Sequence, residues 1–141
     1  QCITGDILDS LKCDCGSQLK KSIEMMSNNG GILLYMPEEG RNIGLLNKLR
    51  AYEFQFHDID TIDANYALGF DADQRRHENA CKLLKVLGVG SIKLITNNPE
   101  KISQVQKGGI KVTETVQIKV KVATEAKNYM ETKKIRSGHN L

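Results

Sequence analysis

The chain has 141 residues, which is the length of one domain and long enough to bury a core of its own. Its composition, 40% hydrophobic and 26% charged residues with no tryptophan, is that of an ordinary soluble protein. No apolar run approaches the roughly 18–20 residues that a membrane span needs, and no basic-then-apolar signal segment is present, so we expect a cytoplasmic protein without a membrane partner. The net charge of +3 fits an anionic small-molecule substrate but decides nothing by itself.

Helical spacing and then a short apolar run mark the chain between residues 18 and 36. Leu19, Ile23 and Met26 recur at the spacing of one helix face, which predicts a helix over residues 18–28 that the following glycines end. Residues 32–36, Ile-Leu-Leu-Tyr-Met, are continuously apolar and stand directly before a proline. A run of this length and composition predicts a buried strand.

Two further helices are expected before residue 70. The first runs from about residue 43 to residue 56 and is amphipathic. The second is short, begins with the capped pattern of residues 60–65 and is closed by Gly69. The expected buried stripe of the longer helix consists of Leu45, Leu46, Leu49 and Phe56.

Helix and strand signals continue to alternate after residue 70. A polar loop over residues 70–76 precedes a helix that ends at Gly88, and residues 91–96 have the pattern of a strand. Asn98 is the expected N-cap of the next helix, with Pro99 at its first position.

The C-terminal part of the chain completes the pattern. Glycines 108–109 close the preceding helix, residues 110–122 are β-rich and are expected as two short strands, and residues 122–136 form a polar C-terminal helix. The alternation predicts an α/β fold, a mixed sheet with helices packed on it, in a single domain of residues 1–141.

Three of the four cysteines lie close together in sequence, in the order C-x10-C-x-C: Cys2, Cys13 and Cys15. Three thiolates can hold zinc and leave the fourth tetrahedral position to water, as in a catalytic site. The alternative is a structural zinc whose fourth ligand is Cys81 or a histidine, although Cys81 falls in the apolar part of a helix, where a buried role is expected. Disulfides are disfavoured because Cys13 and Cys15 are too close for an easy mutual bridge. The lone histidines are expected at the surface: His57, His77 and His139.

Two stretches are suited to bind an anion. In residues 39–42, Glu-Gly-Arg-Asn, a glycine beside an arginine lets backbone and guanidinium approach phosphate oxygens, but the stretch also reads as an ordinary charged turn. Residues 96–101 end a strand and begin a helix, and Thr96 and Lys101 there would complement a phosphate. Pro99 in that stretch also has a purely structural explanation.

The loop of residues 71–76 holds carboxylates beside guanidiniums. Such a cluster is more often a surface network of ion pairs than a site. In a functional role, Asp73 would act as a general base and hold Arg75 in a fixed orientation. The spacing alone leaves both interpretations open.

Taken together, these stretches resemble GTP cyclohydrolase II, an enzyme of riboflavin biosynthesis. The resemblance rests on residues 2–19, which contain the cysteine trio, on residues 39–52, Glu-Gly-Arg-Asn-Ile-Gly-Leu-Leu-Asn-Lys-Leu-Arg-Ala-Tyr, and on residues 60–70 and 94–101. These motifs follow the order of the family from residue 2 to about residue 115. A Gly-His pair near the C-terminus also looks like the ending of the family.

The resemblance implies a reaction and its cofactors. The family hydrolyses GTP in the first step of riboflavin biosynthesis: zinc-activated water opens the imidazole ring at C8, formate and pyrophosphate leave, and the product is 2,5-diamino-6-ribosylamino-4(3H)-pyrimidinone 5′-phosphate. Family members use magnesium on the triphosphate and are typically homodimers, and some are part of a longer chain with an upstream domain.

The resemblance also implies roles for particular residues. Arg75 matches the proposed nucleophile toward the α-phosphate and Asp73 the general base, but a guanidinium stays protonated up to a pKa above about 12, so stabilising charge on the α-phosphate is the alternative role of Arg75. Tyr52 matches a tyrosine near the ring-opening chemistry. The implied zinc ligands are Cys2, Cys13 and Cys15. The positions that match GTP-binding residues are Gln18, Glu39, Gly40, Arg41, Thr61, Thr96 and Lys101.

The chain departs from the pattern of the family at several places. The Arg-Val-His-Ser-acidic run before the first cysteine is represented only by Gln1, and the β-rich N-terminal portion of the family, roughly fifty residues, is missing. Arg76 and His77 replace an acidic and an aromatic residue, and residues 116–118, Val-Gln-Ile, replace Val-Pro-Leu.

Gln1, Arg76 and His77 favour an alternative, a diverged paralogue that binds zinc and a purine nucleotide without completing the reaction. A zinc-stabilised nucleic-acid-binding module fits the isoelectric point of about 8.7. However, no basic stripe interleaved with aromatic residues is present, so we expect no nucleic-acid partner.

Overall fold

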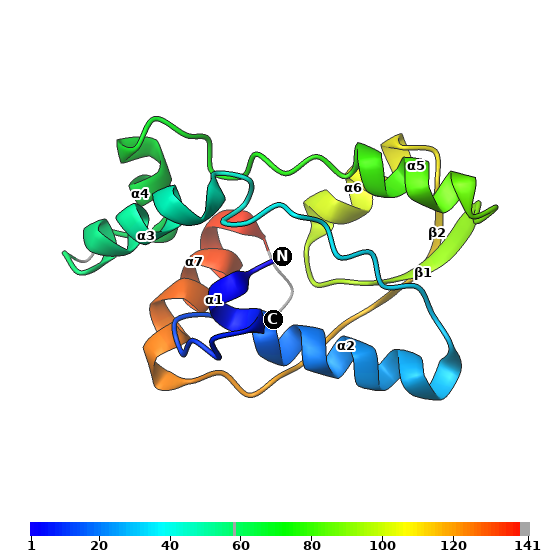
Figure 1. Ribbon diagram of the computed structural model, residues 1–141, viewed down its shortest axis with the longest axis horizontal. Coiled ribbons are helices and arrows are strands. Elements are labelled where there is room, and N and C mark those ends of the chain that lie inside the picture. Colours follow the sequence, from blue (N-terminus) through cyan, green and yellow to red (C-terminus); the bar gives the residue numbers. More distant parts are fainter. Residues whose placement is uncertain (58, 139–141) are drawn as a thin grey trace.

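The computed structural model describes residues 1–57 and 59–138. His139, one of the lone histidines, and with it the Gly-His ending, lies outside the described residues. Figure 1 shows a small sheet at one end of the molecule and helices over the rest of it, so the predicted α/β class is confirmed. The elements are α1 (Ile3–Asp6), α2 (Cys15–Asn29), α3 (Gly44–Gln55), α4 (Thr61–Ala67), α5 (Glu78–Val86), β1 (Ser91–Ile95), α6 (Pro99–Lys107), β2 (Lys111–Val116), the 3₁₀ turn η1 (Thr124–Ala126) and α7 (Lys127–Ser137).

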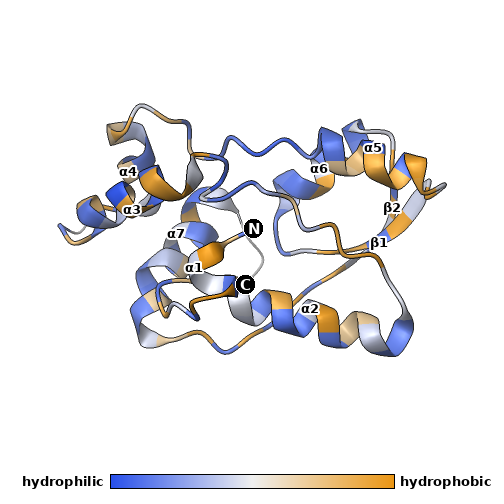
Figure 2. Ribbon diagram, viewed as in Figure 1, coloured by the Kyte–Doolittle hydropathy of each residue, from blue (hydrophilic) through white to orange (hydrophobic). Residues whose placement is uncertain are grey.

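The sheet of the described residues is a β1-α6-β2 unit. β1 and β2 pair in parallel, from Ser91 opposite Lys111 to Ile95 opposite Val116, and α6 makes the crossover. A core of Cys81, Leu84, Val105 and Ile110 lies under α5 and α6, with apolar residues of both strands against it. In Figure 2 the apolar residues of α5 and β1 are orange on the part of the molecule that this core occupies. The strand and the helices predicted over this region are therefore confirmed.

Two predicted helix starts are confirmed by their capping bonds. The Asn98 side chain accepts the Glu100 N–H at 2.9 Å, with Pro99 at the first helical position of α6. The Asp60 carboxylate accepts the N–H groups of Ile62 and Asp63 and begins α4. Such caps satisfy N–H groups that have no partner inside the helix, and each is worth about 1 kcal/mol.

A second group of helices, α3, α4 and α7, packs together on the side of the molecule away from the sheet (Figure 1). α3 contacts α4, and α4 contacts α7. Arg136 of α7 pairs with Asp60 and with Asp63, at 2.9 Å from the latter, so the C-terminal helix is tied to the start of α4. No helix among the described residues is both long and apolar enough to cross a bilayer.

The prediction of a buried strand over residues 32–36 is wrong. The segment has no regular structure, and only Leu34 packs against the core, while Ile32, Leu33 and Tyr35 are exposed. A continuous apolar run does not specify a pairing partner, and in the described residues β1 and β2 pair only with each other.

The expected buried stripe of α3 is also wrong. Leu46 is 63% and Phe56 75% exposed, and Leu45 and Leu49 are exposed too. The buried residue of α3 is Ala51, which is small and lines the large cavity. Periodicity identifies the residues that share a face but not the face that the rest of the chain covers.

The C-terminal elements differ from expectation in extent. Residues 110–122 contain one strand, β2, rather than two, because residues 117–122 leave the sheet. The C-terminal helix is confirmed, but it begins at Lys127, after η1.

Candidate functional site

Two glycines allow the segment of Cys2 to approach the other two cysteines. A Cβ at Gly16 would lie 2.1 Å from the Gly5 carbonyl oxygen, and a Cβ at Gly5 would lie 3.0 Å from Cys13 Sγ. Only residues without a side chain permit this contact between α1 and the start of α2. The contact brings together cysteines that stand eleven residues apart in sequence.

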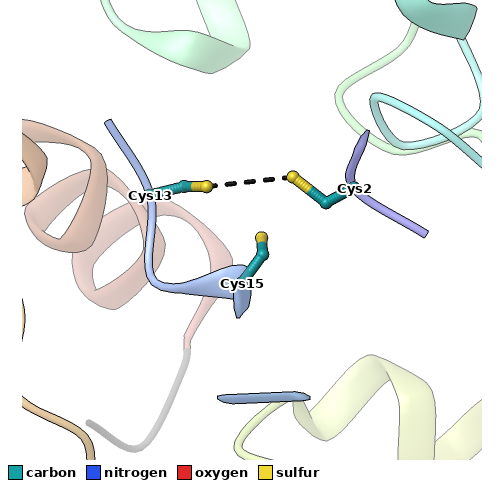
Figure 3. Close-up of side chains that lie close together, drawn as sticks. All are labelled: Cys2, Cys13 and Cys15. Carbon is teal, nitrogen blue, oxygen red and sulfur yellow. Dashed lines mark hydrogen bonds between the residues drawn. The ribbon is translucent and has the colours of Figure 1, made fainter. Parts of the chain in front are cut away.

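The three sulfur atoms form a cluster suited to a metal ion (Figure 3). The Sγ atoms of Cys2, Cys13 and Cys15 all lie within 4.8 Å of one another, and those of Cys2 and Cys13 are 3.8 Å apart. A tetrahedral zinc with Zn–S bonds near 2.3 Å requires sulfur atoms about 3.8 Å apart. The donor set and its spacing therefore fit zinc.

The ionisation of the three thiols is linked, because their sulfur atoms share hydrogen bonds and negative charge. Hydrogen bonds from Cys13 and Cys15, together with Lys48, hold the pKa of Cys2 well below its usual value. The neighbouring sulfurs, first Cys13 and then Cys2, and burial raise the pKa of Cys15. Several thiolates this close need a cation between them, and a dication would supply it.

No fourth protein ligand joins the trio among residues 1–57 and 59–138. Cys81 is buried in the core, as the sequence predicts, and its Sγ faces the Val105 carbonyl. His77 bonds the Gln104 side chain through Nδ1 at 2.7 Å. Within the described residues the cluster therefore offers three ligands, the number that catalytic zinc sites use.

The cysteines line a cavity of about 1260 Å³ that also receives most of the other predicted site residues. Glu39 is the one predicted residue that does not line it. Arg76, one of the departures from the family pattern, lines instead a second cavity of about 800 Å³. Besides the cysteines, the predicted residues on the larger cavity are Gln18, Gly40, Arg41, Tyr52, Thr61, Asp73, Arg75, Thr96 and Lys101.

Asp73 and Arg75 form a fork-shaped ion pair on this cavity. Arg75 Nε lies 2.9 Å from Asp73 Oδ1, and Nη2 lies 2.5 Å from Oδ2. Burial opposes the charge of Asp73, but Arg75 outweighs it and lowers the pKa of that carboxyl. The pKa of Arg75 is raised, because the pairing with Asp73 outweighs burial. The pair therefore keeps a protonated, oriented guanidinium in the cavity.

Further cations surround this pair. Burial and then the charge of Arg75 lower the pKa of Lys101, and within the described residues its ammonium has no hydrogen-bond or ion-pair partner. Arg41 Nη1 donates to the Ala72 carbonyl at 3.1 Å, which ties it to the Asp73 loop. Arg41 has a positive φ of 59°, an uncommon conformation for a residue with a side chain. Clustered cations that lack an anion are suited to polyphosphate.

Thr96, at the end of β1, is fixed by the turn into α6. Its Oγ1 accepts the Asn98 N–H at 3.1 Å. The Asn97 side chain donates to the Ile118 carbonyl and accepts the Ile118 N–H. This turn places the carboxyl end of a strand and a helix N-terminus at the cavity, as the sequence predicts. That edge is where α/β sheets bind anionic ligands.

A buried ion pair under the cysteine loop was not foreseen from the sequence. The Asp14 side chain is 0% exposed, and its Oδ1 lies 2.7 Å from Lys133 Nζ of α7. Asp14 Oδ2 accepts a hydrogen bond from the Gln18 side chain. The pair joins residues 119 positions apart, so no local pattern could have indicated it.

We expect Lys133→Met to destabilise the protein by about 3–5 kcal/mol, because it leaves the Asp14 carboxylate buried without a counter-charge. Lys134→Met, at an exposed position of the same helix, is the matched control and should stay within about 0.5 kcal/mol of the parent. Urea unfolding of the three proteins measures the difference. Equal stability of the two variants would contradict the burial of this pair.

The sequence profile of the family GTP cyclohydrolase II matches residues 1–117. The chain belongs to the GTP cyclohydrolase II family. The GTP cyclohydrolase-2 of Haemophilus influenzae is 47% identical over 142 residues, which cover 100% of this chain and 66% of that protein. Proteins named Riboflavin biosynthesis protein RibBA from Staphylococcus saprophyticus and Staphylococcus aureus (strain COL) are 45% and 46% identical over 138 residues, 98% of this chain and 35% of each relative.

The predicted resemblance to GTP cyclohydrolase II is thus confirmed, and two limits follow from the coverage. This chain spans between about one third and two thirds of the length of these relatives. The family profile ends before α7. The structure alone therefore shows that Tyr129 and Lys133 of this helix line the cavity. That residues 1–141 form one catalytic domain stays a prediction.

Proposed function

We propose that the protein catalyses the GTP cyclohydrolase II reaction: zinc-dependent opening of the GTP imidazole ring with release of formate and pyrophosphate. The product would be 2,5-diamino-6-ribosylamino-4(3H)-pyrimidinone 5′-phosphate, in the first step of riboflavin biosynthesis. The observation that carries the proposal is the single cavity shared by the sulfur trio and the Asp73–Arg75 pair. One GTP molecule in this cavity would reach the sulfur trio with its imidazole ring and the Asp73–Arg75 pair with its phosphates.

In this proposal the thiolates of Cys2, Cys13 and Cys15 hold zinc. When bound, zinc lowers the pKa of water from about 15.7 toward 7 and so supplies a nucleophile strong enough for a ring carbon that bears no carbonyl. The Tyr52 hydroxyl, 3.3 Å from Thr4 Oγ1, is held at the same end of the cavity, and we assign it to the ring-opening step. Burial raises the pKa of Tyr52, which keeps its proton available as a donor.

The other end of the cavity would bind the triphosphate. Arg41, Thr96 and Lys101 supply hydrogen bonds and positive charge for its oxygens, with Mg²⁺ on the phosphates. Because Arg75 is protonated and held by Asp73, we assign it to stabilising charge on the α-phosphate as pyrophosphate leaves. We assign Asp73 first to orienting Arg75, since a carboxylate with a lowered pKa is a weak base.

Three accompanying properties belong to the same proposal. The family resemblance favours a homodimer, and relatives of greater length favour a further domain in a longer chain. Reduced thiols at the zinc site fit the cytoplasm, where such thiols persist.

The proposal is tested with GTP that carries ¹³C at C8. Zinc-loaded protein with Mg²⁺ is expected to release the label as formate and to leave a diaminopyrimidinone identified by mass spectrometry. ATP, which lacks the guanine edge, serves as the control nucleotide. Binding of GTP with all label retained would favour the alternative, a paralogue without turnover.

A further inference from the structure

Lys48 lies at the Cys2 end of the sulfur cluster and makes three short polar contacts. Its Nζ is 3.1 Å from Cys2 Sγ, 2.7 Å from Thr4 Oγ1 and 2.7 Å from Glu39 Oε1. The Lys48 side chain is 12% exposed and that of Glu39 8%. A buried ammonium with this many partners has a fixed position, so its proximity to the thiolate is part of the architecture of the site.

The Glu39 carboxylate is fully engaged inside the protein. Its Oε1 accepts from Lys48, and its Oε2 accepts the Ile3 N–H, the residue next to Cys2, at 2.5 Å. Glu39 also does not line the large cavity. Its Oε2 thus holds the backbone next to Cys2, and its Oε1 holds the ammonium that contacts Cys2 Sγ.

The Lys48 ammonium would offset part of the negative charge of the sulfur cluster. Three thiolates around a dication leave a net charge of −1, which reduces the ability of the metal to activate water. A hydrogen bond from a cation to one thiolate withdraws electron density from that sulfur and offsets the surplus charge. Hydrogen bonds to metal ligands also fix the ligand geometry, and their loss typically lowers metal affinity 10–100-fold.

We propose that Lys48 is a positioning residue of the zinc centre, which orients and partly neutralises the Cys2 thiolate, and that Glu39 holds Lys48 and the Ile3 backbone in place for this role. The inference rests on the proposed zinc site. It adds to that site an outer pair that neither the cysteine spacing nor the family resemblance assigns.

The test measures zinc affinity by competition with a chromophoric chelator in the full chain. Lys48→Met, which removes the charge at nearly constant length, is expected to weaken zinc binding by about 10–100-fold. Lys48→Arg, which restores a donor and a positive charge, should recover most of the loss. Lys20→Met is the matched control, because Lys20 is exposed and pairs with Asp9 away from the sulfurs, and it should bind zinc like the parent.

Cobalt substitution gives a spectrum that would not change if Lys48 only stabilised the fold. The sulfur-to-cobalt charge-transfer bands should shift in Lys48→Met and return toward the parent position in Lys48→Arg. If Lys48→Met fails to fold, Lys48→Gln, which keeps a hydrogen-bond donor but removes the charge, takes its place with the same expectation of weaker zinc binding and shifted bands. Parent-like affinity and spectrum in the folded variant would overturn the proposal.

Glu39→Gln tests whether Glu39 holds Lys48 in place. We expect weaker zinc binding than in the parent, because the amide removes the charge that pairs with Lys48. Parent-like zinc affinity in a folded Glu39→Gln would overturn this part of the proposal. If the parent protein binds no zinc, both the proposed zinc site and this inference fail. If the parent binds zinc and the Lys48 variants bind it equally well, only this inference fails.

Discussion

Cys13→Ser is expected to lose stoichiometric zinc and to reduce formate release by more than about 100-fold, the upper end of the losses seen when only an outer partner of a metal ligand is removed. Cys13 contributes one of the three sulfur atoms within 4.8 Å of one another, and no other protein ligand joins them in the described residues. A serine hydroxyl is a much weaker zinc ligand than a thiolate. Metal analysis and a formate assay on the same preparation measure the two losses.

The fold of Cys13→Ser distinguishes a catalytic zinc from a structural one. The buried core formed by residues of α5 and α6 lies in a different part of the chain from the cysteine trio of the zinc site. We therefore expect the variant to keep most of its secondary structure. Cys81→Ala is the matched control: it removes a cysteine from that core, so it should lower stability yet retain zinc. Complete unfolding of Cys13→Ser would show that the zinc is structural.

Arg75→Ala is expected to reduce pyrophosphate release by about 10²–10³-fold, the usual effect of removing one group that stabilises charge in a transition state. The zinc content should not change, because Arg75 has no contact with a sulfur atom among its hydrogen bonds. Pyrophosphate is measured enzymatically during turnover of GTP.

The neighbouring arginine provides the control for this prediction. Arg76 is exposed and, unlike Arg75, does not line the larger cavity that holds the cysteines, so Arg76→Ala should release pyrophosphate at close to the parent rate. Asp73→Asn should fall between the two, since an amide keeps one hydrogen bond to Arg75 but removes the charge that orients it. Pyrophosphate release by Arg75→Ala at the parent rate would rule out a role at the α-phosphate.

Local signals in the sequence predicted the parts of the fold that depend on local interactions. Asn98 and Pro99 identify the start of α6 because an N-cap and a first-turn proline act within a few residues. The cysteine spacing predicted a common site for Cys2, Cys13 and Cys15, and the structure brings their sulfur atoms together. The apolar run of residues 32–36 was misjudged because its structure depends on which partner lies beside it.

The site residues that the sequence did not reveal are those whose partners are distant in the chain. Lys48 stands in a stretch quoted for the family resemblance, yet its contact with Cys2 joins residues 46 positions apart. Lys133 reads as one more charged residue of a polar helix, although it is buried against Asp14. A buried lysine and an exposed one have the same sequence pattern, and only the three-dimensional packing distinguishes them.

The most direct test of the proposed function is a time course of formate and pyrophosphate in one reaction, with full-length protein, zinc, Mg²⁺ and GTP. Our account predicts both products in equal amounts, because the sulfur trio and Arg75 face one cavity and would act on one substrate. Pyrophosphate without formate would place the failure at the zinc end of the cavity. Neither product, with GTP still bound, would contradict the account and identify the protein as a nucleotide-binding relative without turnover.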